Sequence, residues 1–170
     1  MRRLLPLLLL LAACGREPPP APPPSASFRD ASAPIASTTR GGPADLAGEW
    51  VVAEAFPGGP FGLSRGGTAR LAMDASGTGT WTLTGADGTA RALPVTSPAP
   101  GRYRAAGLGG ETWADLWVLW VDDDFRTAAV GTPDGAFGWV MDRPGAASPD
   151  RARAAREMLD FNGYDLGRLR

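Results

Sequence analysis

The sequence contains no histidine and no lysine, and its single cysteine stands at position 14. Without histidine neither a Ser-His-Asp triad nor a Cys-His pair can form, and the same absence excludes the usual zinc sites. All 17 basic residues are arginines, spread among 18 acidic residues instead of forming a basic stripe, so a nucleic-acid partner is not expected. We therefore expect no enzyme, no metal and no cofactor.

One acidic run, Asp122-Asp123-Asp124, could suggest calcium. A twelve-residue calcium loop needs glycine at its sixth place and glutamate at its twelfth. Here those places hold Thr127 and Pro133. The run is therefore interpreted as a hairpin turn.

The first residues have the pattern of an export signal. Arg2 and Arg3 precede an apolar run, Leu4 to Leu11, which is too short to span a bilayer permanently. Leu11-Ala12-Ala13-Cys14 then resembles a bacterial lipobox. The sequence thus predicts a lipoprotein signal peptide over 1–13 and a lipidated Cys14, the alternative being an ordinary export signal with a chance cysteine.

Proline dominates the stretch that follows. Eight prolines occur between residues 15 and 43, with Ala, Ser, Thr and Gly between them and almost no apolar periodicity. Such a composition favours an extended tether over 14–43, although it could instead be a ligand for a proline-recognising module. The remaining residues, 44–170, are long enough to bury one core and predict a single domain.

Within that domain, period-two alternation and turn residues indicate eight short strands in meander order. The stretch from Trp113 to Val121 is apolar on both faces, so both of its faces should be covered. The predicted fold is all-β, an eight-stranded antiparallel up-and-down barrel, because closure removes exposed strand edges. After a first strand around Trp50, the expected strands are 68–74, 78–84, 89–95, 102–107, 113–121, 125–131 and 136–141.

A helix is expected after the barrel. Ser148-Pro149 is a helix start, Asn162-Gly163 is a stop, and Ala152, Ala155 and Leu159 share one face between them. This apolar face should pack outside the barrel, the alternative being a membrane-surface helix. The expected docking surface is Trp117, Leu119, Val121, Ala128, Val130, Gly138 and Val140.

Three segments in register carry a family resemblance. WVLWVDDDFRTAAVG followed by FGWVMDRP, the Gly48-Glu49-Trp50 segment, and NGYDLGRL from Asn162 resemble the bacterial lipocalins related to apolipoprotein D, over about residues 45 to 170. The resemblance implies a small hydrophobic ligand of the fatty acid or lysophospholipid class. Resemblance to lipoproteins implies acyl chains on Cys14 and, because Gly15 follows it, a place in the cell envelope, in the outer membrane facing the periplasm if the organism has one. It also implies a barrel floor formed by Gly48, Trp50 and Arg143.

Alternation assigns the ligand site to inward-facing side chains. Glu54 would share the inward face of Trp50, where it could bind a ligand head group or reach solvent at the rim. The alternative function is a structural or interaction envelope lipoprotein whose barrel is filled and takes no ligand. The predicted cavity residues are Leu71, Met73, Trp81, Leu83, Tyr103, Val118, Trp120, Phe137 and Trp139.

Overall fold

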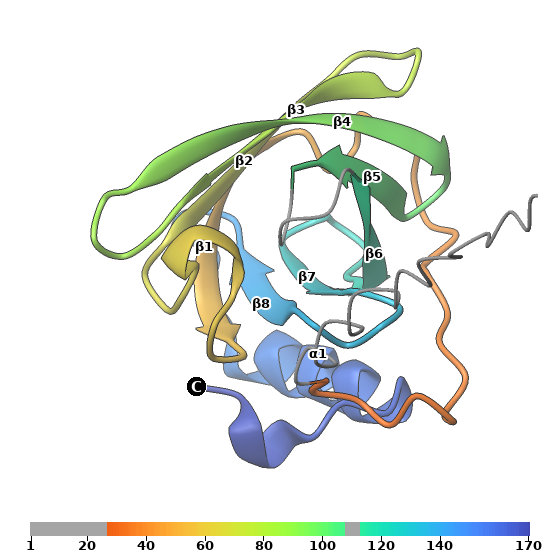
Figure 1. Ribbon diagram of the computed structural model, residues 1–170, viewed down its shortest axis with the longest axis vertical. Coiled ribbons are helices and arrows are strands. Elements are labelled where there is room, and N and C mark those ends of the chain that lie inside the picture. The colour runs from red at the N-terminus through yellow and green to blue at the C-terminus, as the bar shows by residue number, and fades with distance from the viewer. Residues whose placement is uncertain (1–26, 108–112) are drawn as a thin grey trace, which may run out of the picture.

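A computed structural model describes residues 27–107 and 113–170. The predicted signal peptide, Cys14 and the first part of the predicted tether lie outside the described residues. Eight antiparallel strands pair in sequence order, and β1 also pairs with β8, so the sheet closes into a barrel (Figure 1). The predicted fold class is confirmed. The strands are β1 Gly48–Ala55, β2 Thr68–Met73, β3 Thr78–Thr84, β4 Ala90–Ala99, β5 Arg102–Ala106, β6 Trp113–Val121, β7 Thr127–Gly131 and β8 Gly138–Asp142.

The connections alternate between the two ends of the barrel. The β2–β3, β4–β5 and β6–β7 turns lie at one end with residues 43–47, which we call the floor. The β1–β2 and β7–β8 connections lie at the other end, the mouth. The β1–β2 connection holds a short 3-10 helix, η1 (Pro60–Gly62), and places Leu63 in the barrel core with only 2% of its surface exposed.

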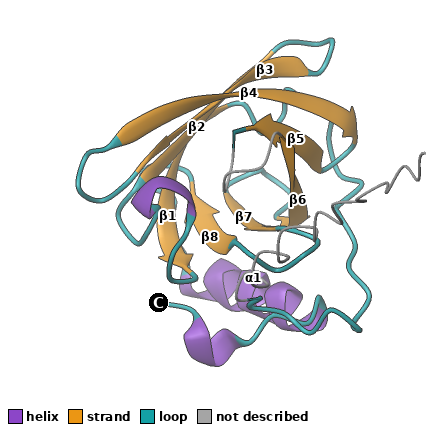
Figure 2. Ribbon diagram, viewed as in Figure 1, coloured by secondary structure: helices purple, strands orange, loops and turns teal. Residues whose placement is uncertain are grey.

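The helix α1 (Pro149–Phe161) packs outside the barrel, as predicted (Figure 2). It contacts β6, β7 and β8, and Ala155 and Leu159 are fully buried there. Tyr164, which follows the helix, donates a hydrogen bond to the Thr132 carbonyl and accepts one from the Thr132 N–H. These contacts hold the helix and a second short helix, η3 (Leu166–Arg168), against the strands that the sequence shows as apolar on both faces.

Two bulges change which side chains face inward. The β1–β8 register shifts between Val52 and Glu54, and the β6–β7 register shifts between Val118 and Trp120. An extra residue reverses the alternation beyond it. Ala55 therefore faces the interior in place of Glu54, and Val121 faces it in place of Trp120.

Part of the predicted docking surface is corrected. The bulge in β6 turns Val121 inward, whereas Ala128 and Val130 face inward because they pair in regular register with Met141 and Trp139. Trp117, Leu119, Gly138 and Val140 face the helix side of the sheet as expected. Val121, Ala128 and Val130 instead belong to the interior cluster, and their places outside are taken by Trp120 and Ala129.

The predicted tether also differs from the structure over residues 27–43, a segment that we call the strap. Phe28 stacks on Phe56 with ring centroids 5.0 Å apart. Arg29 is buried and donates hydrogen bonds to the carbonyl oxygens of Ala33, Pro133 and Asn162. The strap follows the outside of the barrel from beside α1 (Figure 1). Low apolar content did not reveal this packing, because it depends on one phenylalanine, one arginine and backbone hydrogen bonds such as that from the Thr38 N–H to the Val118 carbonyl.

Among the described residues, no helix is both long and apolar enough to cross a membrane.

Candidate ligand-binding site

The barrel interior is an uncharged cluster built from all eight strands. Each strand contributes one or more of its alternate residues, and the floor segment before β1 and the β1–β2 loop add one leucine each. At the centre, Trp81 packs edge-on against Tyr103 at 5.6 Å and against Trp139 at 6.0 Å between ring centroids. The buried members are Leu46, Trp50, Val52, Ala55, Leu63, Ala69, Leu71, Trp81, Leu83, Leu93, Val95, Tyr103, Ala105, Leu116, Val118, Val121, Ala128, Val130, Trp139 and Met141.

The floor is closed by the two residues that the sequence singles out. The Arg143 guanidinium lies 3.9 Å from the centre of the Trp50 ring, so the predicted contact is present. Its Nε donates to the Phe125 carbonyl at 3.1 Å. A side chain at Gly48 would collide with the same guanidinium, whose Nη1 lies 2.7 Å from the place of a Cβ, and the backbone there has φ of +107°. Glycine is required at position 48 on both counts.

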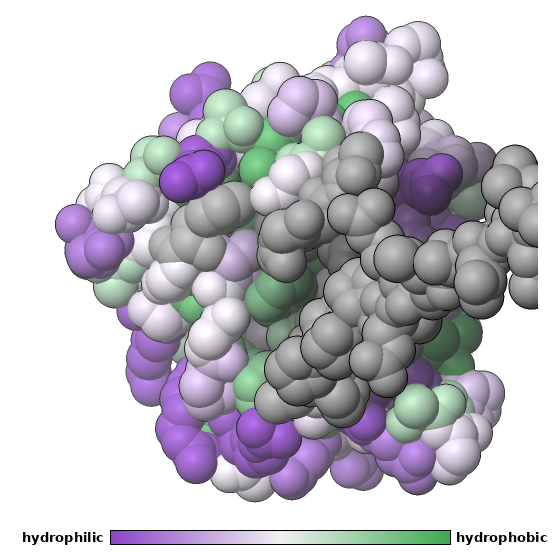
Figure 3. Space-filling view, viewed as in Figure 1, coloured by the Kyte–Doolittle hydropathy of each residue, from purple (hydrophilic) through white to green (hydrophobic). Residues whose placement is uncertain are grey.

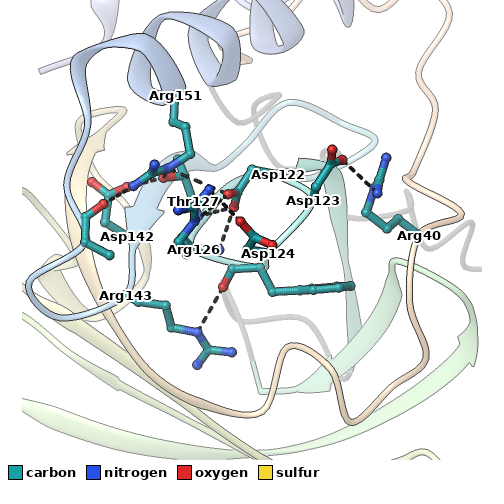
Figure 4. A network of polar contacts seen from close by, with 11 residues as sticks. Arg40, Asp122, Asp123, Asp124, Arg126, Thr127, Asp142, Arg143 and Arg151 are labelled. Carbon is teal, nitrogen blue, oxygen red and sulfur yellow. Dashed lines mark hydrogen bonds and ion pairs between the residues drawn. The ribbon is translucent and has the colours of Figure 1, made fainter.

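Just outside the floor, a polar network joins the β6–β7 turn to the helix (Figure 4). The Asp122 carboxylate accepts hydrogen bonds from the backbone N–H groups of Arg126 and Thr127. The Arg151 side chain reaches from α1 to the Thr127 hydroxyl at 2.9 Å, and that hydroxyl donates to Asp142. The acidic run is therefore a hairpin turn, as predicted, and its first carboxylate is occupied by backbone donors.

The pKa values of the two aspartates in this network are shifted in opposite directions. Burial raises the pKa of the Asp142 carboxyl, against the hydrogen bond from Thr127 and the charge of Arg151. Burial also tends to raise the pKa of Asp122, but the hydrogen bonds from Thr127 and Arg126 prevail and lower it. Both aspartates have a structural role, because the carboxylate of each accepts hydrogen bonds from neighbouring groups of the barrel.

Among the described residues, no group of three potential ligands could hold a metal ion.

Most of the predicted cavity residues lie inside the barrel. Leu71, Trp81, Leu83, Tyr103, Val118 and Trp139 are buried members of the interior cluster. Met73 and Phe137 pack against that cluster and are partly exposed, Met73 at the floor end of β2 and Phe137 at the mouth end of β8.

Trp120 does not face the interior, and its inward prediction is wrong. It packs with the outer cluster that contains Leu119, Ala129 and Leu159. The physical reason is the bulge at Leu119, which lets two consecutive side chains of β6 point outward. Strict alternation could not show this, because every residue from 116 to 121 is apolar and either register buries them.

Glu54 also lies outside the barrel, which corrects its inward prediction. Its carboxylate forms a two-pronged ion pair with Arg156 of α1. It therefore binds no ligand head group inside the barrel. Regular alternation after Trp50 and Val52 would turn the Glu54 side chain into the barrel. The bulge at Ala53 reverses the alternation, so the Glu54 side chain points outward.

Several interior residues were not among those predicted. Leu116, Leu93 and Val95 lie on the inward faces of their strands and follow from alternation alone. Leu63 comes from a Gly- and Pro-rich loop, so no periodicity could place it. Hydrophobic residues are visible at the centre of the face shown in Figure 3, between more hydrophilic edges.

The tyrosine at the centre is poorly ionisable. Burial, with the charge of Asp45, raises the pKa of Tyr103 to about 12. Its hydroxyl donates to the Pro43 carbonyl at 3.4 Å, so it stays neutral and directed toward the floor.

Comparisons with known proteins agree with this architecture. Residues 88–170 match the model of the lipocalin-like domain. The temperature-induced lipocalin-1 of Arabidopsis thaliana is 29% identical over 55 residues, which span 32% of this chain and 30% of that protein. Its whole-protein properties therefore do not transfer directly.

Solved structures show the same fold. Insecticyanin from the tobacco hornworm Manduca sexta aligns with a TM-score of 0.56 at 14% identity, covering 81% of this chain and 84% of its own. Lobster apocrustacyanin A1 aligns with a TM-score of 0.53 at 15% identity, covering 74% of this chain and 76% of its own. Per a 4 from cockroaches aligns with a TM-score of 0.52 at 13% identity, covering 77% of this chain and 87% of its own. The chain therefore has the lipocalin fold, a closed eight-stranded barrel with one C-terminal helix.

Proposed function

We propose that this protein is a membrane-anchored lipocalin that binds, stores or transports a small hydrophobic ligand in the cell envelope. The observation that carries the proposal is the apolar interior of the barrel, because every buried polar or charged side chain among the described residues lies outside it, on the strap, beside the helix, in the network outside the floor or in the β7–β8 connection. These side chains are Arg29, Asp122, Thr127, Thr132, Asp142 and Asn162. A closed barrel of this size has room for side chains or one small ligand. Binding an apolar molecule there removes its surface from water without burying an unpaired charge.

The ligand class that we propose is fatty acid or lysophospholipid, on the resemblance to bacterial lipocalins. The mouth supports entry of a chain-like molecule, because Leu63 and Phe137 are apolar and belong to connections or strand ends, not to strand centres. We propose no catalytic role. The membrane would be reached through acylated Cys14, with the outer membrane facing the periplasm as the proposed location.

A second function, a structural or interaction lipoprotein with a filled barrel, is favoured by one observation. Trp81, Trp139 and Tyr103 each expose only 1% of their surface and pack edge-on across the barrel centre. In this reading the aromatic rings occupy the space that a ligand would take.

Native mass spectrometry of the purified protein separates the two. We expect a lipid to co-purify, or to add saturably when fatty acid or lysophospholipid is supplied. Val118→Arg should abolish the adduct, because it places a charge at a fully buried interior position. The matched control is Thr82→Arg, on the outer face of β3, which should keep the adduct.

Circular dichroism must show that both variants fold. An adduct that survives in folded Val118→Arg would place the ligand outside the barrel. No adduct with any supplied lipid would favour the filled barrel.

A further inference from the structure

Among the described residues, four side chains of the interior cluster carry a hydrogen-bond donor, and they divide into two pairs. Near the floor, the Trp50 indole donates to the Leu46 carbonyl at 2.9 Å and the Tyr103 hydroxyl donates to the Pro43 carbonyl. In contrast, the indole nitrogens of Trp81 and Trp139 are buried and have no hydrogen-bond partner in the described structure.

An unpartnered buried donor is costly, because the group loses its bond to water and gains none in return. Natural interiors satisfy nearly all such groups. Here the two rings that carry the unsatisfied donors are neighbours, since the Trp81 and Trp139 ring centroids lie 6.0 Å apart. They come from β3 and β8, which are not adjacent in the barrel, so the pair lies across its interior. This juxtaposition points to an acceptor that enters from outside the protein.

The charge of the interior limits what that acceptor can be. Among the described residues the one buried arginine is Arg29, which lies on the strap outside the barrel. Arg143 at the floor is occupied by Trp50 and by the carbonyl oxygens of Asp45, Glu49 and Phe125. A carboxylate beside the two indoles would therefore be a buried charge without a cation. A neutral carbonyl oxygen accepts two hydrogen bonds and leaves no charge to compensate.

We propose that the indole N–H groups of Trp81 and Trp139 bind the carbonyl oxygen of an acyl ester, so that the barrel selects acyl-ester lipids over free fatty acids and ether lipids. This inference rests on the proposed function, and it assigns the selective contact within the same site. The acyl chain lies among the apolar side chains of the interior, and the head group stays at the mouth. Entry requires the mouth side chains Leu63 and Phe137 to move, because both indole nitrogens are sealed from solvent in the unliganded barrel.

The test compares two lipids that differ at one group. Lauroyl lysophosphocholine carries an ester carbonyl, and dodecyl lysophosphocholine has an ether methylene in its place, with the same head group and nearly the same chain. Each is titrated into the purified full chain below its micelle concentration, with tryptophan emission as the readout. We expect the ester to bind about tenfold more tightly, as one or two good hydrogen bonds would give.

Trp81→Phe and Trp139→Phe keep an aromatic ring and remove one donor each. Either variant should reduce the ester preference to about threefold or less. The matched control is Trp117→Phe, which removes an indole donor on the outer face and should leave the preference unchanged. Should a variant fail to fold, the indole ¹⁵N–¹H signals of the unaltered protein replace it: those of Trp81 and Trp139 should move downfield with the ester and not with the ether.

The outcomes distinguish lipid binding in the barrel from recognition of the ester carbonyl by Trp81 and Trp139. If neither lipid binds, the proposed function and this inference fail together. Equal binding of ester and ether, or an ester preference that survives both phenylalanine variants, overturns the inference alone. In that case each indole N–H is satisfied by the face of a neighbouring ring.

Discussion

At the scale of single residues, the floor depends on Arg143, which makes several contacts at once. The Arg143 guanidinium covers the Trp50 ring and bonds three carbonyl oxygens of neighbouring segments. Burial lowers its pKa, but arginine stays charged at any physiological pH. The planar guanidinium can stack on the indole and bond carbonyl groups at its edge at once, which lysine cannot do.

Arg143→Ala and Trp50→Ala should therefore destabilise the barrel non-additively. A cation over an indole contributes about 0.5 to 2 kcal/mol, and a double-mutant cycle should return a coupling in that range. Urea denaturation of the four proteins measures it. The matched pair is Arg102 and Trp117, also stacked, at 4.2 Å but on the outer face, where the coupling should be smaller. Additive losses for Arg143 and Trp50 would show that the contact contributes nothing.

At the scale of elements, the β6–β7 turn is fixed by a carboxylate and not by glycine. Asp122 holds the N–H groups of Arg126 and Thr127, while Phe125 takes the positive φ of 54° that such a turn needs. Arg151 of α1 approaches the same carboxylate at 3.7 Å, so the turn also anchors the start of the helix.

Asp122→Asn should lower the free energy of unfolding by about 1 to 3 kcal/mol at neutral pH, because the acceptor of these backbone hydrogen bonds loses its charge and the ion pair with Arg126 is removed. The pKa of Asp122 is lowered in the folded state, so its stabilisation is present above the unfolded pKa, about 3.9, and is lost as the pH falls through the folded value. The gap between wild type and variant should therefore be constant above about pH 5 and close at lower pH.

Urea titrations at several pH values measure that gap. Asp123→Asn is the control, because the Asp123 side chain is 83% exposed and its ion pair with Arg40 lies at the surface. A gap that does not close in acid would mean that Asp122 acts through its shape and not its charge.

At the scale of the whole molecule, the strap shortens the distance that the predicted anchor can span. The described chain begins at Ser27, whose hydroxyl bonds the Asp134 carbonyl in the β7–β8 turn at the mouth. Thirteen residues lead from Cys14 to Ser27, which is about 40 Å if they are fully extended as polyproline II. With residues 27–43 packed on the barrel, an anchor at Cys14 would join the described domain at its mouth end.

Cys14→Ser should release the protein from the membrane fraction or leave it unprocessed, because a serine hydroxyl cannot form the thioether. Fractionation of the native host and intact mass measurement test this. Arg16→Ala, two residues away, is the control and should remain in the membrane with its acyl mass unchanged. Membrane retention of mature Cys14→Ser with the same acyl mass would refute the anchor.

The sequence by itself determined the architecture. Alternating apolar residues and turn signals place eight strands and their order, and Ser148-Pro149 with Asn162-Gly163 bounds the helix at the residues where it is found. Trp50 and Arg143 are likewise found together at the floor. These features are local, or follow from motifs in register, so no long-range contact is needed to infer them. Strand β4 is the exception, since it continues to Ala99 through two prolines.

Only the tertiary structure decided which faces of the bulged strands point inward. Around Leu119 either register buries apolar side chains, whereas around Ala53 the register decides whether Glu54 or Ala55 faces the interior. The choice therefore depends on the docking of α1 and on the ion pair between Glu54 and Arg156 of that helix. The packed strap and the pairing of Trp81 with Trp139 are also long-range results. Whether a buried donor lacks a partner depends on all the groups around it, and in the barrel interior these come together only when the barrel closes.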